Sequence, residues 1–426
     1  MGQLYHVNIQ IGDNVRSFSP AFQTEEKYAS GWKSTLEKIH KRNGLDVVVS
    51  CGCKGKGKKF LCVRHYASSD TYRLAKYANT GFEHEAQCMY FALDDKSTGL
   101  KGYQHGVVRE GNDGLLVVKL NSGLNEKDPT TEETPARPPA QRPEGGQSQM
   151  TLVGLHSLLW TEACLNCWHP GMAGKRSDSL VRHRLLEAAQ GIRCGKTVIA
   201  DILLVGTDPN SAQAKLQDKK IEGLAGSGKR LLIMSTMARY DAERHEKELA
   251  FLPLRQFGGL PLALFSSSIQ WANTIRRFPS EYAAWKSGER VAVLALTSAP
   301  DKTRRGHSVR VNQIALLHVS KNWIPLDSSY EQLVADKLDA ENRNYLKPMR
   351  FDASQGEVFP DFVLVDTRSD SPFPLEVFGM ATPAYLARKQ LKMDYYNRQY
   401  GPYGWWYWDA TLEKNRESIP SFPEKK

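Results

Sequence analysis

The stretch NEKDPTTEETPARPPAQRPEGGQSQ, residues 125–149, most constrains how this chain can fold. It contains almost no apolar side chains, several prolines and charges of both signs. Such a segment cannot bury enough apolar surface to offset the conformational entropy that is lost when a chain is ordered. We therefore predict a flexible linker over 125–149, which separates an N-terminal domain, 1–124, from the rest of the chain.

The length and the charge limit the class of protein. The 426 residues are enough for two to four domains, and 41% hydrophobic content is enough to build cores. No apolar run approaches the roughly 20 residues that a membrane helix needs, so we expect a cytoplasmic protein without a membrane partner. Lysine and arginine total 57 against 47 acidic residues, a net charge of +10, and this excess favours a polyanionic partner such as DNA.

The hydrophobic patterns on either side of the linker predict an α+β multidomain protein. Before it, LYHVNIQI is typical of a strand, and 107–120 of a hairpin that turns at Asn112-Asp113-Gly114. After it, residues 150–326 form a mixed central domain that begins with helices and becomes rich in strands. Residues 327–426 form a final α/β domain.

The last domain has a regular order of predicted elements. A helix covers DSSYEQLVADKLDAENR, and a second helix begins at Thr382 and ends at Gly401. The predicted strands are MRFD (349–352), DFVLVDT, PLEVFGM and WWYWDA (405–410). The expected order is therefore helix, three strands, helix and a closing strand.

Two carboxylates stand in this domain where strands should be buried. Asp361 begins one strand and Glu376 lies between Leu375 and Val377 in the next. An ionised carboxylate among apolar neighbours costs several kcal/mol unless it is paired or binds a metal. Two carboxylates that meet on neighbouring strands could hold Mg²⁺ or Mn²⁺ for phosphodiester hydrolysis. Alternatively, Asp361 is a turn residue after Pro360, and Glu376 pairs with an arginine in the core.

Together, the element order, "PD", and "E" in the next strand resemble the PD-(D/E)XK, or restriction-endonuclease-like, superfamily over residues 327–412. The resemblance implies that Asp361 and Glu376 ligate the catalytic magnesium and that Glu331 on the preceding helix assists. Ser328-x-x-Glu331 is also a capping box, in which Glu331 would only accept a hydrogen bond from a backbone amide.

One position departs from the superfamily pattern. Phe378 stands where the superfamily carries its catalytic lysine, and some relatives place that lysine on the following helix. Tyr385, Lys389 and Lys392 share one face of the predicted helix, so Lys392, or else Lys389, could reach the site. Without such a lysine the domain would bind DNA without cutting it.

The N-terminal domain contains two short pairs of metal-ligating residues. Zn²⁺ takes four tetrahedral sulfur and nitrogen ligands, and two short pairs commonly supply them. The pairs predict a structural zinc site made by Cys51, Cys53, His84 and Cys88. Cys62 and His65 form a spare pair that could replace one of the two, and the alternative is a set of free cysteines with surface histidines.

Three further motifs carry weaker predictions. The basic run KGKGKK, 54–59, lies in the first zinc turn, where it could contact DNA or RNA or remain a solvated loop. Cys164-x-x-Cys167 could be half a zinc site or a redox pair, but its apolar surroundings favour buried small hydrophobes. GLAGSGK, 223–229, departs from a P-loop because Arg230 follows the lysine, so we interpret it as a glycine-rich turn.

Short motifs spread over the chain resemble an uncharacterised bacterial family carried on integrative and conjugative elements. They are the Cys/His cluster, LLWTEACLNCWHPGMAGKR, VSKNWIPLDSSYE and GWWYWDA. The resemblance implies a role in mobile-DNA biology with partner proteins from the same element. We expect a DNA-binding protein with a magnesium-dependent endodeoxyribonuclease domain; the alternative is a catalytically inactive DNA-binding or protein-interaction adaptor.

Overall fold

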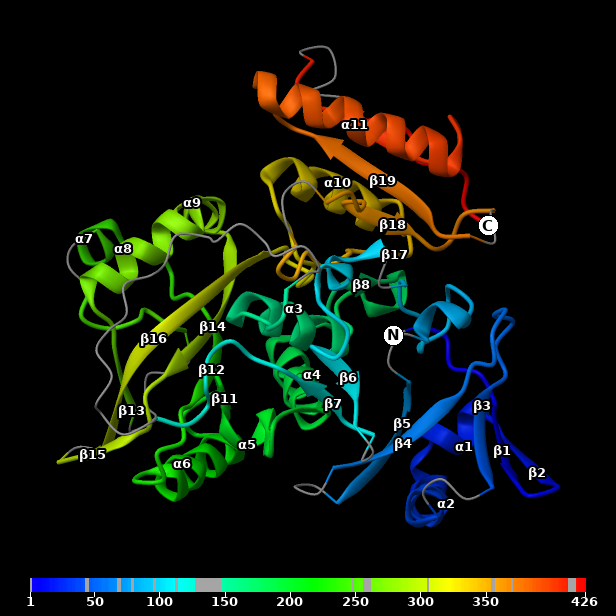
Figure 1. The fold of residues 1–426 in the computed structure, drawn as a ribbon, viewed down its shortest axis with the longest axis horizontal. Coiled ribbons are helices and arrows are strands. Elements are labelled where there is room, and N and C mark those ends of the chain that lie inside the picture. The colour runs from blue at the N-terminus through cyan, green and yellow to red at the C-terminus, as the bar shows by residue number, and fades with distance from the viewer. Residues whose placement is uncertain are drawn as a thin grey trace.

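The computed structural model describes residues 2–42, 46–66, 70–77, 80–94, 97–111, 114–126, 147–246, 249–255, 262–304, 306–353, 357–368, 371–412 and 419–426. Figure 1 shows the N-terminal elements grouped at one side, the central sheets at the other and the C-terminal elements above them. Most of the predicted linker, 127–146, lies outside the described residues. At its two ends, Glu126 N donates to Gly228 O, and Gln147 N donates to Gly102 O.

The N-terminal module is a small sheet packed on a helix. Strand β1 lies between β2 and β3 in an antiparallel sheet, and β4 pairs with β5 in a separate hairpin. The alternation along β1 buries Val7 and Ile9, which pack with Leu36 and Ile39 of α2. The elements are β1 (Val7–Ile11), β2 (Asn14–Phe18), α1 (Pro20–Thr24), α2 (Ala29–Lys41), β3 (Val47–Cys51), β4 (Leu61–Tyr66) and β5 (Thr71–Lys76).

The predicted hairpin over 107–120 forms, with Asn112 and Asp113 outside the described residues. Its strand β7 pairs in parallel with β9 from the far side of the linker, so the sheet order is β10-β9-β7-β6. Helix α3 begins at N-cap Thr151 and is buried over most of its length, as its apolar sequence predicts. The elements are β6 (Val108–Glu110), β7 (Leu116–Val118), α3 (Leu152–Glu162), α4 (Asp178–Gln190), β9 (Ile192–Cys194), β10 (Thr197–Val198) and α5 (Ile199–Ile202).

The larger central sheet has the order β11-β12-β14-β16-β13. The run RVAVLALT forms β14, which pairs antiparallel with β16. Its side chains are buried on both faces of the sheet, as is typical of a central strand. The elements are β11 (Leu203–Val205), α6 (Ala212–Leu224), β12 (Leu232–Thr236), α7 (Ala242–His245), β13 (Leu262–Phe265), α8 (Ser268–Arg277), α9 (Pro279–Lys286), β14 (Arg290–Thr297), β15 (Asp301–Thr303) and β16 (Gly306–Val319).

The C-terminal sheet has the order β20-β19-β18-β17-β8, in which β19 and β20 are parallel and the other neighbours antiparallel. Figure 1 shows α11 lying along this sheet above β19. Apolar residues of α10 pack in one core with Leu375 and Val377, whereas Phe378 packs in another with Tyr396 of α11. The elements are β8 (Cys167–Trp168), α10 (Ser329–Ala340), β17 (Tyr345–Leu346), β18 (Phe362–Leu364), β19 (Phe373–Phe378), α11 (Pro383–Tyr400) and β20 (Trp406–Asp409).

One strand prediction in this domain is wrong. MRFD, 349–352, is not a strand, and the strand that pairs with β18 is Tyr345–Leu346. Met349 and Phe351 instead pack into the core of the central region, and Phe351 has a φ of 48°, which no strand accommodates. Asp352 accepts hydrogen bonds from the backbone N–H and the hydroxyl of Thr151, the N-cap of α3. The segment therefore anchors the last domain to the central one.

Candidate functional site

Asp361 directly precedes β18, and Glu376 lies in the neighbouring strand β19. Phe362 of β18 is directly opposite Leu375 of β19, and the backbone N–H of Asp361 donates to the carbonyl oxygen of Leu375 at 3.0 Å. The Asp361 carboxylate also accepts a 2.8 Å hydrogen bond from the backbone N–H of Val377, which fixes its orientation.

The carboxylate of Glu376 is 1% exposed and is held by two side chains of α11. Lys392 Nζ donates to one carboxylate oxygen, and the hydroxyl of Tyr396, one helical turn later, donates to the other at 2.9 Å. Burial raises the pKa of Glu376 to about 7, and the negative charge of Asp361 adds to the effect against the lowering by Lys392 and Tyr396.

Glu331 lies in the helix cap that the sequence predicts, and its carboxylate also belongs to the acidic group. Its backbone N–H donates to the Ser328 hydroxyl, so the predicted cap exists, and its carboxylate accepts from the backbone N–H of Asp327 at 3.0 Å. The same carboxylate accepts from Lys347 Nζ at 2.7 Å. Burial, together with the charges of Asp327 and Asp361, raises the pKa of Glu331 to about 8 against the lowering by Lys347.

Three carboxylates meet closely enough to share a cation. One oxygen each of Asp327, Glu331 and Asp361 lie within 4.8 Å of one another. Carboxylate oxygens are the protein ligands that Mg²⁺ and Mn²⁺ accept, so this group could hold a divalent ion. Sequence analysis did not select Asp327; its position four residues before Glu331, at a helix entry, was the available signal.

Two cations approach the same group from the segment after β17. Lys347 Nζ is 3.1 Å from Asp327, and Arg350 Nε donates to the same carboxylate at 2.7 Å. Arg350 also lies 3.8 Å from Asp361. Burial alone would raise the pKa of Asp327, but Lys347 and Arg350 lower it below its usual range. With Lys392, three cations therefore face the four carboxylates of the site, Asp327, Glu331, Asp361 and Glu376.

The two predicted lysines have different partners. Lys392 contacts Glu376, whereas Lys389 forms an ion pair with Asp409 at the end of β20 and donates nothing to the carboxylate group. Phe378, at the usual lysine position, is fully buried against Tyr396 and Trp405. Of the predicted residues, Glu331 and Asp361 lie in the group of three carboxylates, whereas Glu376 is not a member of that group and pairs with Lys392 instead. Lys389 lies outside both.

The predicted zinc ligands form a compact buried group in the N-terminal module. Cys51 ends β3, Cys53 follows it, and His84 and Cys88 come from the segment after β5. Cys51 Sγ is 3.7 Å from Cys88 Sγ, and His84 Nδ1 is 3.6 Å from both Cys53 Sγ and Cys88 Sγ. A tetrahedral zinc ion with bonds of about 2.3 Å to sulfur and about 2.0–2.1 Å to nitrogen separates its ligands by about 3.5–3.8 Å. These side chains could therefore hold a metal such as zinc.

The spare pair lies elsewhere. The thiol of Cys62 points to the carbonyl oxygen of Ala75 within the β4–β5 hairpin, and His65 Nε2 lies 3.0 Å from Asp70. In the lysine run, Gly55 faces Glu83 so closely that a Cβ atom would come within 2.0 Å of its carbonyl oxygen. The glycines thus let the loop pack beside the metal group, while the side chains of Lys54, Lys56 and Lys58 are exposed.

Two weaker motifs have different outcomes. The prediction that Cys164 and Cys167 are buried is wrong, because Cys164 is exposed and Cys167 is half-buried. The turn at GLAGSGK follows α6, with positive φ at Gly226 and Gly228, and leads to β12, as the interpretation as a glycine-rich turn requires.

Comparison with known proteins gives a family without an assigned activity. No curated protein and no solved structure matches the chain. Among the described residues, none of the helices has both the length and the apolar character needed to cross a bilayer. Residues 21–411 match the profile of a family described as a protein of unknown function, DUF1173, and the chain therefore belongs to that family.

Proposed function

We propose that this chain is a DNA-binding protein whose C-terminal domain hydrolyses phosphodiester bonds with a divalent metal ion. The observation that supports the proposal is the group of three carboxylates, Asp327, Glu331 and Asp361, whose oxygens lie within 4.8 Å of one another. The neighbouring strand β19 carries Glu376, which is paired with Lys392 of α11. A structural ion pair needs only one acid and one base. Here three carboxylates lie close enough to share a cation, and the ammonium group of Lys392 lies on the neighbouring Glu376.

The order of elements supports a PD-(D/E)XK-like domain. Helix α10 precedes the antiparallel strands β17, β18 and β19, and α11 then leads to β20, which is parallel to β19. This is the helix, three strands, helix and strand order that the resemblance implies. The zinc group and the exposed lysines beside it belong to a separate module, which supports an additional polyanion contact.

The residues of the site fit a hard cation. Asp327, Glu331 and Asp361 would hold it, and a bound divalent ion would supply activation of water and charge neutralisation at the phosphate. Glu376 orients Lys392, whose ammonium group would stabilise the negative charge that develops on the phosphate. Tyr396 fixes the second oxygen of Glu376 and so limits the orientations open to this pair.

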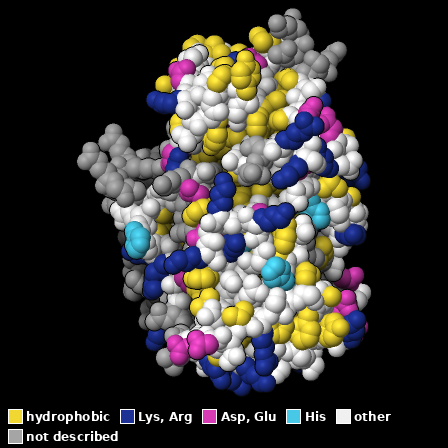
Figure 2. All heavy atoms as spheres, turned by 90° about the vertical axis from the view of Figure 1, so that its right-hand side faces the viewer, with side chains coloured by type: hydrophobic (Ala, Val, Ile, Leu, Met, Phe, Trp, Pro, Cys, Tyr) yellow, Lys and Arg dark blue, Asp and Glu magenta, His cyan; other side chains and the backbone are white. Residues whose placement is uncertain are grey.

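Charge on the surface supports DNA as the substrate. The chain carries a net charge of +10. Figure 2 shows lysine and arginine side chains spread across the middle of one face, with few acidic side chains between them. Such a distribution attracts nucleic acid at long range and gives binding that weakens steeply with salt. Together with the resemblance to a family of integrative and conjugative elements, this supports a cytoplasmic role in mobile-DNA processing, beside other proteins of the element.

The test is a plasmid-cleavage assay with added Mg²⁺ or Mn²⁺. Lys392→Met should lower the cleavage rate by about 10²- to 10³-fold, the usual effect of removing one group that stabilises transition-state charge. Lys389→Met is the matched control: it removes a lysine from the same helix that is also paired with a carboxylate, and it should retain cleavage. Cleavage that survives both Lys392→Met and Asp361→Asn would refute the assignment.

A non-cutting adaptor is the second candidate, and burial is the observation that favours it. Glu376, Lys347 and Glu331 are only 1–3% exposed, and each is ion-paired. A site in this state serves as a structural charge network. The adaptor predicts salt-sensitive DNA binding without metal-dependent cleavage in the wild-type protein, and a pure protein-interaction scaffold predicts no DNA affinity at moderate salt.

A further inference from the structure

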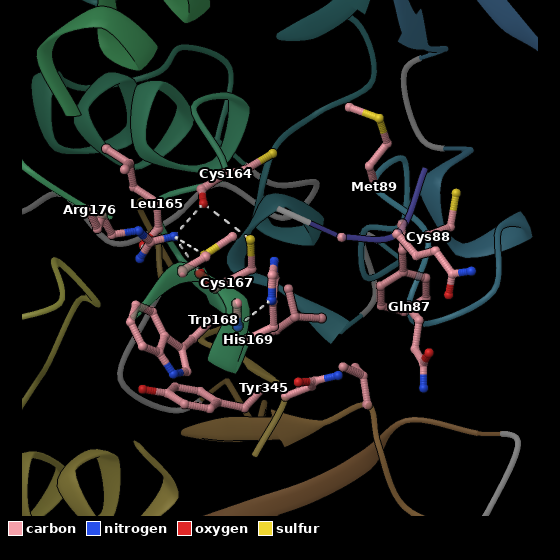
Figure 3. Close-up of a pocket in the computed structure, with 18 of the residues that line it drawn as sticks. Gln87, Cys88, Met89, Cys164, Leu165, Cys167, Trp168, His169, Arg176 and Tyr345 are labelled. Carbon is pink, nitrogen blue, oxygen red and sulfur yellow. Dashed lines mark hydrogen bonds between the residues drawn. The ribbon is translucent and has the colours of Figure 1, made fainter. Parts of the chain in front are cut away.

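A cavity of about 530 Å³ lies where the N-terminal module, the α3–β8 segment and the C-terminal sheet meet. Its walls include Met89 from the N-terminal module, Leu346 from β17, and the pair Cys164 and Cys167. Figure 3 shows Cys164, in the turn after α3, and Cys167, at the start of β8, across the cavity from Gln87, Cys88 and Met89. A molecule that entered this cavity would therefore have access to both cysteines.

These two cysteines are not explained by the metal group or by core packing. The chain has seven cysteines, of which Cys51, Cys53 and Cys88 belong to the zinc group. Cys62 is buried in β4, and Cys194 is a half-buried residue of β9. Cys164 and Cys167 remain, separated by two residues and reachable from solvent. In a reducing compartment, this spacing outside a metal site is typical of a redox-active dithiol.

The side chain of Arg176 ties together the backbone around both cysteines. The guanidinium group of Arg176 donates to the carbonyl oxygens of Cys164 at 3.0 Å, Leu165 at 3.3 Å and Cys167 at 2.6 Å. The thiol of Cys167 donates to the carbonyl oxygen of Cys164 at 3.1 Å, which places the second sulfur next to the first residue. Cys164 has a φ of 54°, the left-handed conformation that closes the turn after α3.

The two thiols also differ in the way that exchange chemistry requires. Cys164 is exposed, and interaction with the Cys167 thiol lowers its pKa to about 6. The same interaction and burial raise the pKa of Cys167 above its ordinary value. The attacking group in disulfide exchange is the accessible thiolate, and the resolving group is a neighbouring protonated thiol. Cys164 fits the first role and Cys167 the second.

We propose that Cys164 and Cys167 form a redox-active dithiol that exchanges with a small disulfide of the glutathione class bound in the cavity. The Cys164 thiolate attacks one sulfur of the incoming disulfide, forming a mixed disulfide and releasing one thiol, which takes up a proton. The Cys167 thiol loses its proton and attacks the Cys164 sulfur, releasing the second thiol. Two cysteines are oxidised to one disulfide, and the incoming disulfide is reduced to two thiols.

The experiment is equilibration of the full chain in glutathione buffers of increasing oxidised fraction, followed by alkylation and peptide mass mapping. The wild type should lose two alkylatable thiols and give a peptide that carries the Cys164–Cys167 disulfide, without loss of zinc. Cys194→Ser, a matched substitution of the remaining half-buried cysteine, should behave like the wild type. Cys167→Ser should retain a glutathione adduct on Cys164, because the resolving thiol is gone.

Three results would overturn the proposal. One is the absence of a Cys164–Cys167 disulfide in the wild type under fully oxidising buffer, which depends on no variant. Another is oxidation that forms disulfides among the zinc cysteines instead and ejects the metal. The third is a second bound metal ion that is lost in both Cys164→Ser and Cys167→Ser, which would make the pair a metal site. None of these outcomes depends on DNA cleavage.

Discussion

Replacing Lys392 by methionine should destabilise the protein in a pH-dependent way. Lys392 is the cation that contacts the buried carboxylate of Glu376. Because burial raises the folded-state pKa of Glu376 to about 7, above its unfolded value, the folded state binds a proton that the unfolded state does not. The stability due to that proton is fully present in acid and is lost as the pH rises through about 7.

The size of the effect follows from the same linkage. Near pH 6, Glu376 is mostly protonated in the wild type, so losing Lys392 removes little charge attraction. Without Lys392, the pKa of Glu376 rises further, so folded Glu376 stays protonated to higher pH. Each pH unit over which only the folded state is protonated lowers the free energy of unfolding by about 1.4 kcal/mol. The difference in unfolding free energy between wild type and Lys392→Met should therefore grow by about 1.4 kcal/mol between pH 6 and pH 8.

The free energy of unfolding is measured by guanidinium titration at pH 6, 7 and 8 in buffer without Mg²⁺ or Mn²⁺, with tryptophan fluorescence as the signal. Lys389→Met is the control on the same helix. Its partner Asp409 has a pKa that is lowered despite burial, by hydrogen bonds from Lys389 and Thr411, so it is ionised over the whole range. The control should lose a constant amount of stability. Equal costs of Lys392→Met at pH 6 and pH 8 would refute the reasoning about Glu376.

Two further predictions concern the metal groups. Cys53→Ser should remove bound zinc, whereas Cys62→Ser, which changes another buried thiol of the same module, should keep it. Measuring the zinc content per chain checks both variants. Loss of zinc in Cys62→Ser would contradict the ligand set. Mn²⁺ should bind more tightly at pH 8 than at pH 6, because Glu331, with a pKa raised to about 8, must release a proton when the metal binds. Asp327→Asn should weaken the binding, and a calorimetric titration of Mn²⁺ measures both effects.

Local periodicity predicted the parts of the carboxylate site that lie on regular elements. The strand patterns placed Asp361 at the start of one strand and Glu376 within the next, and the structure has Asp361 directly before β18 and Glu376 in β19. Helical spacing selected Lys392, which contacts Glu376. Among the residues not predicted from the sequence, Lys347 and Arg350 lie in an irregular segment after β17. No repeat marks such a segment, so only the tertiary fold shows that both cations face Asp327.

The same limit explains the errors at the domain contacts. A strand predicted at 349–352 is instead a segment that packs Met349 and Phe351 into a neighbouring core. The pattern of apolar residues in such a segment is the same whether the segment packs in a sheet or against another domain. In the N-terminal module, short spacings identified two pairs of candidate metal ligands. Only the pairing of β4 with β5, which turns the Cys62 thiol toward Ala75, shows that Cys62 is not one of them.

The charge balance of the buried site connects its burial with its proposed chemistry. Four carboxylates face three cations, and most of these groups are almost completely removed from water. Burying an unbalanced negative charge is costly, so without a metal the deficit is met by a proton, as the raised pKa values of Glu331 and Glu376 indicate. A divalent cation would meet the same deficit at the three oxygens of Asp327, Glu331 and Asp361. A proton and a bound metal ion would therefore compete for the same buried charge deficit, which a fully paired structural network would not have.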